Sequence, residues 1–510
     1  MIHGDLLGER ARLSPEREAL VTVADRKRYR YRELDQRAVG CARMWMYGLG
    51  LRPGDRVAIL SGNRIELLDA FFAAGKSGVV LVPLSTRLTA NELELIVRDC
   101  GPRALIYGGE HRALVRRLRP RVEVDFWVAL DEPDRDDDLD YAEMVLTRGA
   151  GSSVHRRCRP EDPYCLLYTS GTTGRPKGVV IPHRQISWNA YSTATCWQLD
   201  ENDVSSIFTP LYHAGGLGAF LTPLIMAGGR LVLHANFDAA EVWRVIEQEA
   251  CTAVLGVPTI WKILADAPEF QTVDLSRVRW LISGGAPLPR HLIEVYRARG
   301  VVLRQGYGLT EVGVNCFTMT DEEAYAKAGS VGRPMMFTEA KVVSESGQEL
   351  PAGEVGELCF RGPHVSAGYW NNPQATAEVY DSQGWFHTGD MAVRDEDGFF
   401  FIAGRAKDMF ISGGVNVYPA EIESQLLQHP EVRDAAVIGV ADETWGEVGV
   451  AFVVPREGVE IDAAGLAGFL GARLARYKLP KRFIVVGELP RTPYGKVVKA
   501  ELAKLLAGGG

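Results

Sequence analysis

The sequence has no apolar run that approaches the length needed to cross a membrane, and residues 1–18 are polar and charged. A spanning helix needs about 20 consecutive apolar residues, and a secretory signal needs an apolar stretch near the amino end. The expected location is therefore the cytoplasm. The basic runs at 26–32 and 112–121 leave peripheral membrane contact open, although solvated surface is the favoured interpretation of both.

Cysteine is scarce, and an excess of positive charge is absent. The eight cysteines among 510 residues include no C-x-x-C pair, so we expect reduced, mostly buried thiols and neither a disulfide framework nor a zinc site. The net charge of −8 argues against a nucleic-acid partner. No internal repeat is evident, and a chain of this length exceeds one ordinary core, so two or more domains are expected.

Short apolar runs alternate with helical patterns through most of the chain. The runs at 57–60, 79–82, 253–257 and 280–282 predict buried strands, and their alternation with helices predicts α/β layers with partly parallel sheets. Closely spaced strands and turns between 341 and 401 predict a small β-barrel-like subdomain.

The pattern changes again after residue 405, where helices and strands alternate in a unit large enough to be a domain. We predict helices at 419–428 and 463–476 and strands at 435–440, 450–454 and 483–486. The expected division is a large N-terminal domain over 1–404 and a compact α+β C-terminal domain over 409–510, joined by residues 405–408.

The segment 168–178 reads Tyr-Thr-Ser-Gly-Thr-Thr-Gly-Arg-Pro-Lys-Gly. Backbone N–H groups in a glycine-rich turn form a concave anion site, and hydroxyls and a lysine add donors and charge. The spacing is not that of a Walker A loop, and the apolar runs on both sides predict a strand-to-strand connection. Phosphate binding is therefore assigned to Thr169, Ser170, Gly171, Thr172, Thr173, Gly174 and Lys177.

This segment and eight others resemble, in the same order, the motifs of the AMP-forming, or adenylate-forming, enzymes. That family includes acyl-CoA synthetases, aryl-CoA ligases, luciferases and peptide-synthetase adenylation domains. The other segments are 210–217, 283–287, 305–311, 384–390, 404–408, 412–414, 419–423 and 492–496. The resemblance implies that a carboxylate and ATP form an acyl-adenylate and pyrophosphate, and that coenzyme A then yields acyl-CoA and AMP. ATP, Mg²⁺ and coenzyme A are the implied cofactors and co-substrates.

The resemblance also implies a nucleotide site. Small residues let a flat base lie against the backbone, and an aromatic ring can stack on the other face of the base. These roles fall to Gly284, Gly285, Ala286, Tyr307 and Gly308. Asp390 resembles the aspartate that accepts from both ribose hydroxyls, and Arg405 resembles the arginine that joins it. Thr310 is expected to bind the α-phosphate, and Glu311 with Thr169 to hold Mg²⁺, a hard cation that prefers oxygen ligands.

Lys496 matches the lysine that bridges the substrate carboxylate and the α-phosphate. The first reaction brings two anions together, so a positioned cation is required. The family's C-terminal domain rotates between the two half-reactions. The resemblance therefore implies an N-terminal adenylation domain over 1–404, a hinge over 405–408 with Lys407 at the hinge position, and a mobile C-terminal lid domain over 409–510. Gly413 and Gly414 would line the pantetheine tunnel, and the CoA phosphates are assigned to Arg87, Lys478 and Lys481.

The acyl pocket is expected to be lined mostly by small residues and by no charged residue. Its assigned residues are Trp188, Ala214, Gly215, Gly284, Gly306, Gly308, Gly313 and Val314, with His213 at the mouth. This lining favours a long or bulky apolar acid, because a dicarboxylate pocket would usually contain an arginine. A medium- or long-chain fatty acid is preferred slightly over a coumarate- or ferulate-type acid, and the resembling bacterial enzymes are of both types.

Three functional alternatives stay open. An acyl-CoA ligase is favoured over a stand-alone adenylation enzyme that loads a carrier protein, and both are favoured over a non-catalytic or luciferase-like relative. Small-molecule partners are expected in the first case, and the sequence leaves monomer and homodimer open.

Overall fold

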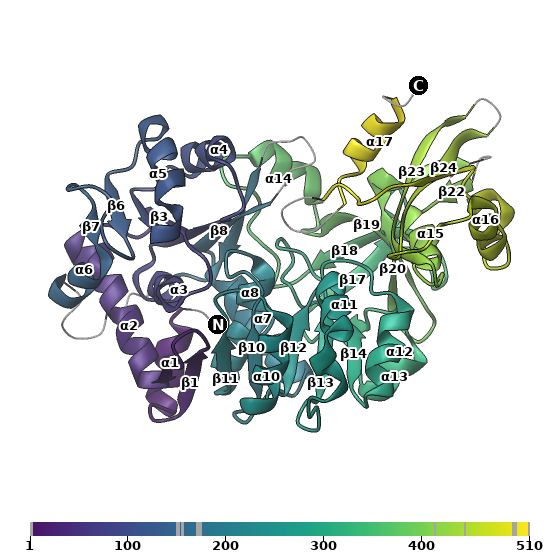
Figure 1. Ribbon diagram of the computed structural model, residues 1–510. Coiled ribbons are helices and arrows are strands. Elements are labelled where there is room, and N and C mark those ends of the chain that lie inside the picture. Colours follow the sequence, from purple (N-terminus) through teal and green to yellow (C-terminus); the bar gives the residue numbers. More distant parts are fainter. Residues whose placement is uncertain are drawn as a thin grey trace.

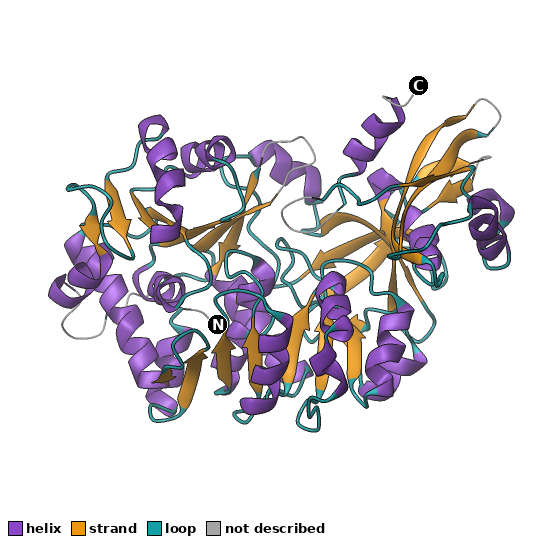
Figure 2. Ribbon diagram, viewed as in Figure 1, coloured by secondary structure: helices purple, strands orange, loops and turns teal. Residues whose placement is uncertain are grey.

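A seven-stranded sheet near the N-terminus forms the first layer of the computed structural model, which describes residues 4–148, 154, 158–169, 176–412, 415–442, 445–491 and 497–507. Its strand order is β7-β6-β5-β3-β4-β8-β9, and every pair is parallel except β8 and β9. The strands are β3 (Arg56–Leu60), β4 (Val80–Leu84), β5 (Ala104–Tyr107), β6 (Phe126–Ala129), β7 (Leu139–Asp140), β8 (Pro163–Thr169) and β9 (Lys177–Pro182). Figures 1 and 2 show this sheet on the left, with helices on its faces.

Helices connect the parallel strands of this sheet, as parallel pairing requires. They are α3 (Ile65–Ser77), α4 (Ala90–Cys100) and α5 (Arg112–Leu118). Val57 and Ile59 of β3 pack in the core that includes α3, whereas Ala58 and Leu60 pack in the core that includes α4 and α5. The alternation follows from the two-residue period of a strand, and it explains why these strands read as continuous apolar runs.

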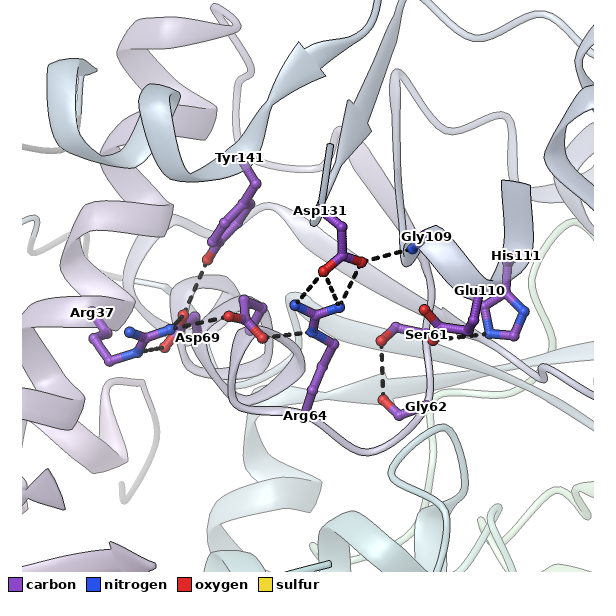
Figure 3. A network of polar contacts seen from close by, with 11 residues as sticks. Arg37, Ser61, Gly62, Arg64, Asp69, Gly109, Glu110, His111, Asp131 and Tyr141 are labelled. Atoms are coloured by element: carbon purple, nitrogen blue, oxygen red, sulfur yellow. Dashed lines mark hydrogen bonds and ion pairs between the residues drawn. The ribbon is translucent and has the colours of Figure 1, made fainter. Parts of the chain in front are cut away.

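A polar network ties the N-terminal helices to this sheet (Figure 3). Arg37 of α2 (Tyr31–Arg43) pairs with Asp69 of α3 at 2.7 Å, and Tyr141 donates to the same carboxylate at 3.2 Å. Arg64, which precedes α3, pairs with Asp131 after β6 at 3.0 Å. These elements are thus held together by charged contacts that no local sequence pattern reveals.

The second α/β layer consists of two adjoining sheets. One has the order β10-β11-β1-β2 and the other the order β12-β13-β14, and the backbone N–H of Thr252 donates to Val204 at 2.8 Å between them. The strands are β1 (Glu18–Thr22), β2 (Arg28–Arg30), β10 (Val204–Ile207), β11 (Arg230–Leu233), β12 (Ala253–Gly256), β13 (Trp280–Ser283) and β14 (Val302–Gln305). The surrounding helices are α1 (Leu6–Leu13), α7 (His183–Cys196), α8 (Ala214–Gly218), α9 (Leu221–Ala227), α10 (Ala239–Gln248), α11 (Pro258–Asp266) and α12 (Arg290–Ala298). Helix α6 (Tyr141–Arg148) instead packs against α2 and β7 beside the first sheet.

The predicted β-rich subdomain is an antiparallel sheet in chain order, β17-β18-β19-β20. Its strands are β17 (Glu339–Val343), β18 (Val355–Arg361), β19 (Phe386–Arg394) and β20 (Phe400–Arg405). The short pair β15 (Phe317–Thr318) and β16 (Arg333–Pro334) and the helices α13 (Asp321–Ala326) and α14 (Pro373–Val379) lie on either side of β17 and β18 in the sequence. The segments predicted as strands from 57 to 401 therefore do form strands.

The C-terminal unit has its own sheet, β22-β21-β24-β23, with β25 parallel to β24 (Figure 1, right). The strands are β21 (Phe410–Ser412), β22 (Val415–Val417), β23 (Val432–Asp442), β24 (Gly446–Pro455) and β25 (Arg482–Val485), and the helices are α15 (Pro419–Leu426), α16 (Ala463–Gly471) and α17 (Lys499–Ala507). The helix predicted over 463–476 is shorter than expected and ends at Gly471, where two glycines in four residues lower helix propensity. The α/β class with a large N-terminal and a small C-terminal domain is confirmed.

The two basic runs are largely neutralised by acidic neighbours. Arg28 pairs with Glu18 at 2.7 Å and with Glu249 at 2.6 Å. Arg116 of α5 pairs with Asp134 at 2.6 Å, so the acid-rich loop after β6 covers the arginine-rich helix. Across the described segments, no helix combines the length and apolarity that a bilayer crossing requires. No disulfide joins the eight cysteines, all of which are described, and seven of them are buried.

Candidate active site

Asp390 lies at the centre of a polar cluster beside the second α/β layer. Its Oδ2 accepts a hydrogen bond from the hydroxyl of Tyr307 at 2.6 Å, and its Oδ1 pairs with Nε of Arg405 at 2.6 Å. Asp390 and Arg405 face each other in the register of β19 and β20, and Tyr307 follows β14. The structure therefore brings together three residues that the sequence assigned to the ribose and the base.

A bulge in β19 aims this aspartate. The register of β18 with β19 shifts between Glu357 and Cys359, and Gly389 has φ of +70°. The N–H of Gly389 donates to Oε1 of Glu357 at 2.8 Å. Bulges redirect side chains next to active sites, and a left-handed residue in one favours glycine. The backbone conformation of this bulge therefore explains why a glycine precedes Asp390.

The ring of Tyr307 packs among apolar side chains, whereas its hydroxyl points to Asp390. Its ring lies 6.0 Å from that of Phe360 at 18° between planes. Burial, with the Asp390 charge second, raises the pKa of Tyr307 well above its ordinary value. The phenol is therefore neutral and donates to the carboxylate.

The predicted base slot lies at the carboxyl ends of three parallel strands, where open α/β sheets bind ligands. Gly284 follows β13 and Gly306 follows β14, and N–H of Gly306 donates to Ser283 at 2.8 Å. A Cβ on Gly284 would have Leu255 as its nearest neighbour at 3.7 Å, and Gly285 and Ala286 are exposed. At this edge of the sheet, large side chains therefore do not fill the space in front of the backbone.

Position 308 requires a glycine for a different reason. A Cβ there would lie 2.3 Å from the backbone of Val314, because the loop 308–314 folds back on itself. N–H of Leu309 donates to Gly313 at 3.1 Å and closes this turn. Gln185 of α7 then donates to the carbonyl of Thr310 at 3.0 Å. The loop that carries Thr310 and Glu311 is thus fixed by contacts on both sides.

The phosphate loop connects β8 to β9, an antiparallel pair in which Thr169 faces Lys177. The predicted strand-to-strand connection is confirmed. Ser170, Gly171, Thr172, Thr173 and Gly174 lie outside the described residues.

Tyr369, which the sequence reading missed, joins this loop to Glu311. Nζ of Lys177 lies 5.0 Å from the centre of the Tyr369 ring, and the Tyr369 hydroxyl donates to Oε1 of Glu311 at 3.0 Å. Burial and the Glu311 charge raise the pKa of Tyr369, so this hydroxyl keeps its hydrogen at neutral pH. The lysine assigned to phosphate and the carboxylate assigned to the metal therefore share one ring.

The residues assigned to the acyl pocket come from α7, α8 and the 306–314 loop. Trp188 lies 4.9 Å from Phe337, ring centre to ring centre, and both approach Tyr191. His213 caps α8, with Ala214 and Gly215 in its first turn, and a Cβ on Gly215 would have only Leu255 near it, at 3.8 Å. A Cβ on Gly218 would lie 2.9 Å from Val314, so Val314 packs against α8.

Asn189 is a second residue that the sequence reading missed. Its Nδ2 donates to the carbonyl of Gly218 at 2.8 Å, and it is 5% exposed. Within the described residues its Oδ1 is buried and has no hydrogen-bond partner. Gly313, with φ of +81°, faces that oxygen, because a Cβ there would lie 2.9 Å from it. A buried acceptor beside the residues assigned to the acyl pocket would be satisfied by a donor.

The residues assigned to coenzyme A are not all equally available. Lys478 pairs with Glu421 at 2.7 Å, whereas Lys481 is exposed and lies 5.5 Å from the Trp445 ring centre. Arg87 is exposed and follows β4 in the N-terminal domain, and Lys407 is exposed in the short 3-10 turn Ala406–Asp408. Gly413, Gly414 and Lys496 lie outside the described residues.

Comparisons with known proteins agree with this geometry. A model of the AMP-binding enzyme family matches residues 7–370, and one of the AMP-binding enzyme C-terminal domain matches residues 421–496. The chain belongs to the AMP-binding enzyme family. This confirms the resemblance to the AMP-forming acyl-CoA ligases, whose use of ATP and coenzyme A fits the site.

Similar proteins include ligases for different acids. A feruloyl-CoA synthase of Amycolatopsis sp is 40% identical over 502 residues, 97% of each chain. The long-chain-fatty-acid–CoA ligase FadD13 of Mycobacterium tuberculosis is 37% identical over 503 residues, 98% of this chain and 97% of its own. ATP-bound MatB of Rhodopseudomonas palustris superposes with a TM-score of 0.88 at 30% identity and 99% coverage of each chain.

Proposed function

We propose that this acyl-CoA ligase carries out both half-reactions at the site built around Asp390 and Glu311. The observation that carries the proposal is the contact of Tyr369 with both Lys177 and Glu311. It supports one polyphosphate position between the phosphate loop and a metal-binding carboxylate.

In the first half-reaction, Glu311 and Thr169 would hold Mg²⁺ through carboxylate and hydroxyl oxygens, the donors this ion prefers. The ion would offset phosphate charge. Lys177 binds the β- and γ-phosphates, Thr310 the α-phosphate, and Lys496 bridges the substrate carboxylate and the α-phosphate. A cation at that bridge favours attack of one anion on another, and charge on the phosphoryl oxygens is stabilised as pyrophosphate leaves.

In the second half-reaction, the C-terminal domain 409–510 turns about the hinge at 405–408 and removes Lys496 from the site. Gly413 and Gly414 then line the path of the pantetheine chain. Among the three cations assigned to CoA phosphates, Lys481 is best supported, because it is exposed and its partner is an aromatic ring. Lys478 is less well supported as a ligand of these phosphates, because Glu421 already neutralises its charge.

The proposed substrate is a hydroxyaryl-propenoic acid of the coumarate or ferulate type. The unpartnered Oδ1 of Asn189 supports it, since a phenolic hydroxyl supplies the donor that a fatty acid lacks. The feruloyl-CoA synthase relative is consistent with this choice. A medium- or long-chain fatty acid, the first expectation from the sequence, is the second candidate, and the open space at Gly215 and the FadD13 relative favour it.

The deciding experiment is pyrophosphate release with Mg²⁺-ATP and a panel of acids, followed by AMP release with coenzyme A as sole acceptor. We expect coumarate or ferulate to exceed cinnamate, which has the same skeleton without the phenolic hydroxyl, by about tenfold in kcat/KM. Octanoate or palmitate as the best acid would establish the second candidate. A best acid that is acetate or succinylbenzoate would contradict the pocket argument, and adenylation without AMP release on adding coenzyme A would point to a carrier protein as acceptor.

A further inference from the structure

Three metal-ligating side chains meet on the two inner strands of the β-rich subdomain, and none of them is assigned to ATP. Glu357 and Cys359 lie on β18 two positions apart, so they project to the same face of the sheet. His387 faces Cys359 across the ladder in β19. One ligand atom from each of the three lies within 4.8 Å of the other two.

The distances among these atoms suit one tetrahedral ion. Nδ1 of His387 lies 3.4 Å from Sγ of Cys359 and 2.8 Å from Oε2 of Glu357. Around zinc, a nitrogen at about 2.0 Å and a sulfur at about 2.3 Å are separated by about 3.5 Å. Two ligands of one zinc ion lie further apart than the 2.8 Å between Nδ1 and Oε2, so an ion between the three atoms requires the carboxylate to move away from the imidazole.

A carboxylate also lies near the far side of the histidine, at ion-pair distance and beyond the length of a hydrogen bond. Ligation through Nδ1 places the imidazole hydrogen on Nε2, and Nε2 lies 3.9 Å from Oδ2 of Asp381. The backbone N–H groups of Gln383 and Trp385 donate to the other oxygen of Asp381, so this carboxylate is fixed in place. A carboxylate behind a ligating histidine sets its tautomer and its orientation.

The surroundings favour a soft divalent cation. Cys359 is fully buried against Val343 and Trp385, whereas Glu357 and His387 are each more than a quarter exposed, so an ion can enter from their side. Glu357, Asp381 and a cysteine thiolate supply three negative charges. Lys341 and Arg361 lie 4.2 and 4.6 Å from the Trp385 ring centre and are the cations close to them. Arg361 also pairs with Glu339 at 2.6 Å, so the local balance stays negative. A thiolate with a histidine selects zinc over magnesium.

We propose that Glu357, Cys359 and His387 bind one Zn²⁺ ion, with water as the fourth ligand. The thiol proton passes to solvent as the zinc–sulfur bond forms. The spacing of the cysteines gave no sign of this site, because the cross-strand register assembles it. Glu357 also accepts from Gly389 through its other oxygen, so the ion would hold the carboxylate that supports the turn before Asp390.

The test is cobalt spectroscopy on the chelator-treated full chain without nucleotide. We expect one Co²⁺ per chain with a cobalt–thiolate charge-transfer band, which added Zn²⁺ abolishes. Cys359→Ser should lose the band, and Cys251→Ser, a substitution at another buried cysteine, should keep it. No band in the wild type, or a band that persists in Cys359→Ser, overturns the proposal.

A second variant covers the case in which Cys359→Ser does not fold. His387 is partly exposed, so His387→Gln should fold, and its Co²⁺ affinity should fall by about tenfold or more. Unchanged affinity and an unchanged spectrum in His387→Gln would overturn the proposal. Neither readout depends on ligase activity.

Discussion

Tyr369 donates its phenolic hydrogen to Oε1 of Glu311 across 3.0 Å, although 58 positions separate the two residues. The same ring faces the ammonium group of Lys177. A single tyrosine thus connects the strand that leaves the phosphate loop to the carboxylate assigned to the metal, and its hydroxyl and its ring have separable roles.

Tyr369→Phe keeps the ring and removes the hydrogen bond. A hydrogen bond to a charged group contributes about 1.5–3 kcal/mol, so kcat/KM for Mg²⁺-ATP should fall by about tenfold or more, with a higher Mg²⁺ requirement. Steady-state kinetics across Mg²⁺ concentrations measures this. Tyr164→Phe is the matched control, because its hydroxyl binds the carbonyl of Phe71 in the core at 2.8 Å. Equal losses in both variants would show that Tyr369 acts only through stability.

Lys496→Ala should slow adenylation by orders of magnitude and spare the conversion of preformed acyl-adenylate to acyl-CoA. The reason is that the lysine offsets charge only when carboxylate and phosphate meet. Separate assays of pyrophosphate release and thioester formation test it. Lys504→Ala is the control, since Lys504 pairs with Glu501 on exposed α17. Equal loss in the two half-reactions would refute the assigned role and the lid rotation with it.

Asn189→Leu should change the preference between acids. The variant removes the buried acceptor, so kcat/KM for coumarate should fall by about tenfold while cinnamate is little changed. The coumarate-to-cinnamate ratio is the quantity to measure, because any general packing defect cancels from it. A ratio that does not move would exclude Asn189 as the partner of a phenolic hydroxyl.

Much of this site could be predicted from sequence because its residues follow strands. Gly284 and Gly306 come directly after two strands, and parallel strands bring their carboxyl ends together. Asp390 and Arg405 were assigned through motifs, and the register of two neighbouring strands explains their contact. Local pattern and global fold agree at these positions.

Tyr369, Asn189 and the Glu357–Cys359–His387 cluster were not predicted, and the reason is shared. Each depends on a contact between segments far apart in the chain, and each residue type is ordinary where it stands. Asn189 lies on a helix whose buried face is mostly small or polar, so one more amide carries no local signal. The cysteine and histidine pair through a cross-strand register that no spacing rule contains.

Acid should weaken the fold through His364. Burial lowers the pKa of its imidazole to about 4, with the charge of Arg184 contributing, and its Nδ1 bonds the carbonyl of Val312 at 2.6 Å. The unfolded state, with a pKa near its ordinary 6.5, binds more protons between these values. The free energy of unfolding is therefore not reduced by this group above pH 6.5, and it decreases as the pH falls toward 4. The decrease is about 2 kcal/mol at pH 5.

Melting temperatures of wild type and His364→Asn at pH 8 and pH 5 test this. Asparagine can still donate to Val312 but does not titrate, so the wild type should lose more stability than the variant on acidification. An equal loss would mean that other groups govern acid sensitivity.

Glycines at this site should divide into those that make room for ligand and those that make room for protein. Gly308→Ala would place a Cβ 2.3 Å from the backbone of Val314, so the 308–314 loop must shift. We expect a lower melting temperature and loss of both half-reactions. Gly284→Ala meets only Leu255 at 3.7 Å, so it should fold normally and raise KM for ATP by about tenfold, because the new methyl group occupies the space assigned to the base. Thermal melting and ATP titration separate the two effects, and a normal KM in a stable Gly284→Ala variant would move the base elsewhere.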